Sequence, residues 1–137
     1  DLLLFRSFDE TELVETMEQE FDPFICEFEA LFDCKFEKIF SIVYSGNLKH
    51  LLFKSYLDKL DIFKLTTIFK LSSLTKSVIL SYFFVNKKIN YKTLYKLTNI
   101  EYNYQQKRWG IVEEQLLMNK DFIERIKNIS FFFKNIS

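Results

Sequence analysis

The chain has 137 residues, with 19 Lys and Arg, 19 Asp and Glu, and a formal net charge of zero. Two glycines and one proline are too few for a many-stranded sandwich or barrel, because tight turns and hairpins use these residues. The hydrophobic content of 48% is that of a globular protein. We therefore expect one compact, mainly all-α domain over residues 1–137, with at most one short extended segment near residues 35–44.

The zero net charge conceals an asymmetry along the sequence. Residues 1–35 hold eleven acidic and two basic residues, a net charge of −9, and residues 36–137 carry the compensating +9. The simplest consequence is an attraction within the molecule, screened beyond about 8–10 Å at physiological salt. The lysines of the basic part recur every five or six residues, which rotates them around a helix, so we expect no nucleic-acid partner.

The first predicted elements are helical and acidic. Leu13, Met17 and Phe21 form a stripe at helical spacing that ends at Asp22-Pro23, where proline predicts a kink or a break. Residues 9–33 are therefore expected to form an acidic helical hairpin. Residues 35–44 are rich in β-branched and aromatic side chains, which favours the short extended segment.

Helical spacing resumes at Leu48 and continues along the rest of the chain. Asp61 is expected to cap a second helix that breaks at Ser72-Ser73. Residues 75–85 are apolar nearly all round, which predicts the central, buried helix of the domain.

The remaining predicted helices follow Asn86. Asn90 is expected to cap a short helix. A last helix, capped by Thr98 or Asn99, is expected from about residue 101 to beyond residue 127, with Gly110 inside it.

Catalytic, cofactor and metal sites are not expected. His50 has no acid or cysteine at ligand spacing, so no nucleophile with its base can be assembled around it. Cys26 and Cys34 read as reduced residues of the core or its boundary. Glu113 and Glu114 would point about 100° apart on a helix, which argues against an acid–base pair.

No apolar run approaches the roughly 20 residues of a membrane span, and we expect neither membrane insertion nor a small-molecule substrate.

The most unusual segment spans residues 102–116. It holds the chain's one tryptophan, Trp109, followed by Gly110 and surrounded by polar side chains. Two interpretations stay open together. Trp109 could anchor the helix to the core with Gly110 making room for it, or it could contact a partner.

Several short motifs in this chain resemble one family, the alpha-subunit-binding assembly chaperones of F(1)-type ATP synthase. The motifs, in chain order, are Asp1-Leu2-Leu3-Leu4-Phe5-Arg6, Phe21-Asp22-Pro23, Leu60-Asp61-Ile62-Phe63, Leu71 with Thr75 to Leu80, and Tyr104-Gln105, Trp109-Gly110 and Val112-Glu113-Glu114. Phe21 stands where the family has tryptophan. The resemblance covers about residues 1–130.

This resemblance implies a helical chaperone domain and no enzyme activity. Such a domain would bind the unassembled alpha subunit and shield its apolar interface until the subunit pairs with beta. Tyr104, Gln105, Trp109, Glu113 and Glu114 are the expected partner-binding residues. The family also carries an N-terminal β-rich domain, which is not expected in this chain.

Two alternatives stay open beside the chaperone. One is a helical protein–protein adaptor whose acidic hairpin, residues 9–33, docks on a basic partner or on the chain's own basic part. The other is a non-functional fragment. Ala occurs once and Arg three times, a bias typical of AT-rich genomes. The expected location is the cytoplasm for a bacterial source, which this bias favours, and the mitochondrial matrix for a eukaryotic one.

Overall fold

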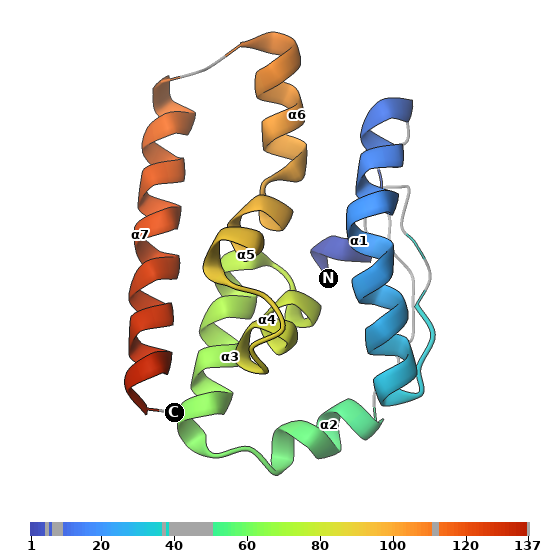
Figure 1. Ribbon diagram of the computed structural model, residues 1–137, viewed down its shortest axis with the longest axis vertical. Helices are drawn as coiled ribbons and strands as arrows, with labels where there is room; N and C mark the ends of the chain where they lie inside the picture. The colour runs from blue at the N-terminus through green and yellow to red at the C-terminus, as the bar shows by residue number, and fades with distance from the viewer. Residues whose placement is uncertain (5, 7–9, 37, 39–50, 111–112, 137) are drawn as a thin grey trace.

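The computed structural model is mainly helical, with no strand in its described part, which comprises residues 1–4, 6, 10–36, 38, 51–110 and 113–136 (Figure 1). Its elements are the 3-10 helix η1 (Leu2–Leu4) and the α-helices α1 (Thr11–Phe32), α2 (Leu51–Asp58), α3 (Ile62–Thr75), α4 (Val78–Val85), α5 (Tyr91–Thr98), α6 (Ile100–Trp109) and α7 (Glu113–Ile136). The expected all-α fold is confirmed. Most of the extended segment expected near residues 35–44 lies outside the described residues, and residues 35, 36 and 38 are not in a strand.

Helix α4 is the centre of the domain. It contacts α1, α3 and α5, while α7 packs along α3 and α5. Figure 1 shows α1 and α7 on opposite sides, with α3, α4 and α5 between them. Ile79, Leu80 and Phe83 of α4 are almost fully buried, and each such side chain contributes about 1.5–3 kcal/mol. The sequence prediction of a central helix is confirmed, although α4 begins at Val78 and Thr75 still belongs to α3.

Helix α1 is one continuous helix, so the expected hairpin at Asp22-Pro23 is wrong. Pro23 lies exposed inside the helix, where it removes a hydrogen bond at a cost of about 3 kcal/mol. The apolar stripe keeps its register across the proline, from Phe21 to Ile25 and Phe28, and these side chains are buried. At about 1.5–3 kcal/mol each, they outweigh the cost of the proline.

The break expected at Ser72-Ser73 is also absent, since α3 continues to Thr75. The Ser72 hydroxyl donates a hydrogen bond of 3.2 Å to Ser81 of α4, and Thr75 donates one of 2.7 Å to the Leu71 carbonyl. These hydroxyls find partners without interrupting the helix. Leu71, one residue before this pair, is fully buried, so the core-facing side of α3 continues past Ser72-Ser73.

Of the helices whose preceding residue is described, α3, α4 and α5 begin with a side-chain cap that satisfies an unpaired backbone N–H. Asp61 accepts from the Lys64 N–H at 2.9 Å, Ser77 from the Leu80 N–H at 3.1 Å, and Asn90 from the Thr93 N–H at 2.8 Å. The predicted caps Asp61 and Asn90 are therefore confirmed.

The last predicted helix is divided into α6 and α7. Gly110 caps α6 with φ +94° and ψ 174°, a conformation essentially restricted to glycine. A Cβ at this position would meet nothing within 4 Å. Gly110 therefore turns the chain, and the interpretation that it makes room for a close neighbour is wrong.

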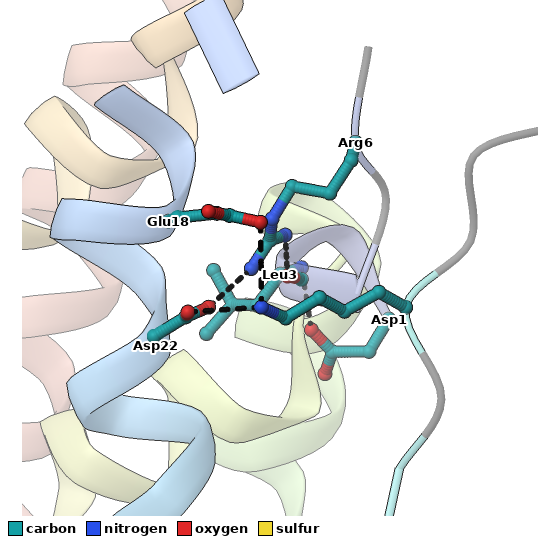
Figure 2. Close-up of polar contacts among 6 residues, drawn as sticks. Asp1, Leu3, Arg6, Glu18 and Asp22 are labelled. Atoms are coloured by element: carbon teal, nitrogen blue, oxygen red, sulfur yellow. Dashed lines mark hydrogen bonds and ion pairs between the residues drawn. The ribbon is translucent and has the colours of Figure 1, made fainter. Parts of the chain in front are cut away.

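Residues before α1 are fastened to the core at two points. The Asp1 carboxylate accepts hydrogen bonds from the Ser77 hydroxyl at 2.8 Å and the Ile79 N–H at 3.0 Å, at the start of α4. Arg6 is fully buried and pairs with Asp22 of α1 at 2.6 Å (Figure 2).

Figure 2 also shows how the Arg6 guanidinium lies between Asp22 and the Leu3 carbonyl, to which it donates at 2.5 Å. Lys38 donates to the same aspartate at 2.9 Å, and this hydrogen bond raises the pKa of Lys38. The motif at residues 1–6 thus contacts two of the other motifs quoted above, at residues 21–23 and 75–80.

Candidate functional site

Three of the expected partner-binding residues, Tyr104, Gln105 and Trp109, lie in α6, on two different faces of the helix. Tyr104 and Arg108, four residues apart, share the face that meets α1. There the Tyr104 hydroxyl donates to the Glu10 carboxylate at 3.2 Å, and Arg108 donates to the same carboxylate at 2.5 Å and to Tyr104 at 3.2 Å. Tyr104 is half-buried. Its side chain therefore holds α6 against α1.

Gln105 and Trp109 share another face of α6. Both line a pocket of about 540 Å³, together with residues from Thr98 to Gly110. Trp109 is 74% exposed. It does not anchor α6 to the core, so that interpretation of Trp109 is wrong, and its contact with a partner stays a prediction.

Exposed apolar side chains occur at the end of α6 and near the start of α7. Trp109 is the last residue of α6, and Leu117 and Met118, each more than half exposed, lie about one turn into α7. Figure 1 places these two helix ends at one extremity of the molecule. We call Trp109, Leu117 and Met118 the α6–α7 tip. Of these three residues, the sequence analysis had indicated only Trp109.

Glu113 and Glu114 begin α7 at the same extremity. Their side chains lie outside the described part of the structure, so the structure places only their backbone. A carboxylate in the first turn of a helix is stabilised by the helix dipole, by about 0.3–1 kcal/mol.

Acidic residues at the start of the sequence form ion pairs with basic residues of later helices in the same chain. Glu10, the N-cap residue of α1, pairs with Arg108 of α6, and Glu20 of α1 pairs with Lys96 of α5 at 3.3 Å. Exposed pairs of this kind contribute about 0–1 kcal/mol each. The acidic helix therefore docks on the chain's own basic part, one of the two arrangements that the adaptor hypothesis allowed.

Both cysteines are free thiols. Cys26 is exposed, so the expectation that it lies in the core or at its boundary is wrong, whereas half-buried Cys34 packs against the core. Burial, and then the nearby Glu29 and Asp33, raise the pKa of the Cys34 thiol. This thiol stays protonated at neutral pH, which disfavours redox or nucleophilic chemistry.

Metal-ligating side chains do not cluster anywhere in the described residues, and His50 lies outside them. Among the helices described, none combines the length and the hydropathy that crossing a membrane requires.

Neither protein-family models nor curated proteins match the sequence of this chain. Solved structures match its fold. Atp12 from Paracoccus denitrificans superimposes with a TM-score of 0.88 at 24% sequence identity, over 98% of this chain and 58% of that chain. A candidate chaperone from Agrobacterium tumefaciens gives a TM-score of 0.89 at 19% identity, over 100% of this chain and 52% of that one. The chain thus spans less than two thirds of either protein, and over that length it has the helical fold of Atp12.

Proposed function

We propose that the chain is an assembly chaperone of the Atp12 type, which binds the unassembled alpha subunit of F(1) ATP synthase. It would shield the apolar subunit interface of alpha until beta takes its place. Two independent lines support this proposal. The fold is that of Atp12, an ATP synthase assembly chaperone, and the ordered sequence motifs resemble the same family.

The observation that carries the proposal is the exposed α6–α7 tip. Trp109 is 74% exposed although its burial would contribute several kcal/mol. Tryptophan is among the residues most enriched in the energetically dominant centres of protein interfaces. A free alpha subunit exposes the apolar surface meant for beta, which is an aggregation hazard. An apolar tip is suited to cover such a surface.

The polar residues around the tip favour reversible binding. Gln105 is exposed beside Trp109, and Glu101 lines the same pocket. A polar rim around an apolar centre is the usual arrangement of an interface that must separate again. Reversibility is required because beta has to displace the chaperone.

Co-purification with alpha and beta subunits, each expressed alone, tests the proposal. We expect capture of alpha and not of beta. Trp109→Ala should weaken capture at least about tenfold, equivalent to about 1.4 kcal/mol, and should leave the Tm unchanged because the side chain is exposed. Phe131→Ala is the matched control, since Phe131 is equally exposed near the other end of α7. Equal capture of both subunits, or of neither, would refute the proposal.

Charge reversal at the start of α7 tests the role of the acid pair. Glu113→Lys and Glu114→Lys should each weaken capture of alpha by more than the loss of helix-dipole stabilisation, about 0.3–1 kcal/mol, can explain. Parallel capture and thermal-unfolding measurements separate the two effects. If the Tm and the affinity fall together, the acids serve the fold and not the partner.

A further inference from the structure

Helix α3 is apolar on two opposite faces. Its inner face, with Ile68 and Leu71, is buried in the core. Its outer face carries Ile62, Leu65 and Phe69 at positions i, i+3 and i+7, and Ile62 and Phe69 are both 71% exposed. An apolar stripe on a helix is normally buried against another element. Among the described residues, no element covers the outer stripe of α3, because Ile62 and Phe69 are exposed.

This outer face borders a groove between α3 and α7. The groove holds about 670 Å³, and its apolar lining consists of Phe69 and Leu74 from α3 and Ile129 from α7. Arg125 and Asn128 also line it. Phe132, part-exposed, extends their stripe along α7 at helical spacing.

Every charged side chain that lines the groove is basic. Lys70 and Lys76 come from the α3 side and Arg125 from α7. Helix α3 contains no acidic residue. Asp121, one turn from Arg125, pairs with it at 2.9 Å, and both side chains are mostly exposed. The groove thus combines an apolar lining with a positively charged border.

We propose that this groove, called here the α3–α7 groove, binds an amphipathic helix of another protein whose apolar side is flanked by Asp and Glu. The apolar side of that helix would cover Phe69 and Ile62, and its acids would face Lys70, Lys76 and Arg125. Docking of a helix face in an apolar groove is a recurrent mode of recognition. The proposal is independent of the alpha-subunit function, because the groove and the α6–α7 tip share no residue.

A second copy of the chain fits the groove poorly. Its strongly acidic helix is α1, whose exposed face carries Glu12, Glu15 and Glu27. Leu31 is the one large apolar side chain exposed on α1, all of which is described. This face could match the charges of the groove but could not cover its apolar lining.

Two labelled 18-residue peptides test the proposal by fluorescence anisotropy. Both carry leucines along one side of a helix, one with glutamates flanking the leucines and the other with lysines. We expect the glutamate peptide to bind at least tenfold more tightly than the lysine peptide, and less tightly at higher salt. Phe69→Ser should weaken its binding at least tenfold with an unchanged Tm, because Phe69 is exposed. Ile62→Ser is the second variant and should act in the same direction.

Trp109→Ala is the matched control, an equally exposed aromatic outside the groove. It should leave peptide binding unchanged. Equal affinity for the two peptides, an unaffected Phe69→Ser variant, or an equal loss in Trp109→Ala would each overturn the proposal. Sedimentation equilibrium adds one more outcome. A dimer that Phe69→Ser dissociates would identify a second copy as the occupant and would also overturn it.

Discussion

The buried pair between Arg6 and Asp22 offers a sharp test of what fastens the first residues to α1. Arg6 has no exposed side-chain surface, whereas Asp22 is 33% exposed and also pairs with Lys38 at 2.9 Å. The two single substitutions therefore leave different groups behind in the folded chain. Asp22→Asn takes the Asp22 carboxylate away from a buried guanidinium that keeps its other contacts, but Arg6→Met leaves a carboxylate that is part-exposed and still paired with Lys38.

The magnitudes follow from this difference. Stranding one member of a buried ion pair costs about 3–5 kcal/mol. The partial exposure of Asp22 reduces this, so we expect Asp22→Asn to cost about 2–4 kcal/mol. Arg6→Met keeps much of the buried volume and should cost about 1–2 kcal/mol. Either loss is a substantial share of a typical total stability of about 5–15 kcal/mol.

Urea unfolding followed by circular dichroism at 222 nm measures these costs. Tryptophan fluorescence is a poor probe here, because Trp109 is already 74% exposed in the folded chain. Glu18→Gln is the matched control, since Glu18 meets Lys38 at 3.5 Å on the surface and should contribute less than about 1 kcal/mol. The double variant Arg6→Met/Asp22→Asn should cost less than the sum of the single variants. An additive double variant, or an Asp22→Asn cost below that of Arg6→Met, would refute the reasoning.

Three further predictions concern single positions. Gly110→Ala should destabilise the chain by about 1–3 kcal/mol through backbone strain alone, measured by urea unfolding, because no neighbour obstructs a Cβ there. At pH 8, Cys26 should react with a thiol reagent before Cys34, whose pKa is raised by burial and two acids; quantification by mass spectrometry would contradict this if Cys34 reacted first. Lys38→Met should lower stability below about pH 10.5, the ordinary pKa of lysine, and this difference from wild type should shrink as pH rises above that value, because the folded-state pKa is raised by the hydrogen bond to Asp22. A difference that grows with pH in urea unfolding would contradict the assignment.

Local chemistry explains which parts of the fold the sequence predicts. The caps at Asp61 and Asn90 depend on one side chain and a backbone N–H three residues ahead, so they can be read from a few residues. The central position of α4 follows from its uniformly apolar composition. Both features can be predicted from a short stretch of sequence, without knowing which other segments pack against it.

The errors arise where tertiary packing outweighs a local signal. Pro23 would break an isolated helix, but the buried stripe that passes through Phe21 and Ile25 holds α1 together. The unbroken register on both sides of the proline was the available clue. Gly110 gives the opposite error, because helical periodicity continues on both sides of a residue whose φ of +94° ends the helix.

The candidate site shows the same limit more strongly. Tyr104 and Trp109 belong to one motif, yet Tyr104 is tied to Glu10 and Trp109 is exposed. Spacing on α6 separates the two faces, but only the position of α1 determines which of them is covered. The partner-binding roles of the whole set therefore stay predictions for the capture experiment, namely those of Tyr104, Gln105, Trp109, Glu113 and Glu114.

Arginine provides a clue that the sequence did contain. The chain has sixteen lysines and three arginines, and each arginine is paired with a carboxylate, at Asp22, Glu10 and Asp121 respectively. The planar guanidinium binds carboxylates with a fixed geometry that an ammonium group lacks. Where composition otherwise favours lysine so strongly, a retained arginine indicates a specific contact. Arg6 ties the residues before α1 to Asp22 of that helix, and Arg108 of α6 pairs with Glu10 at its N-cap, so two of the three arginines mark contacts that periodicity does not reveal.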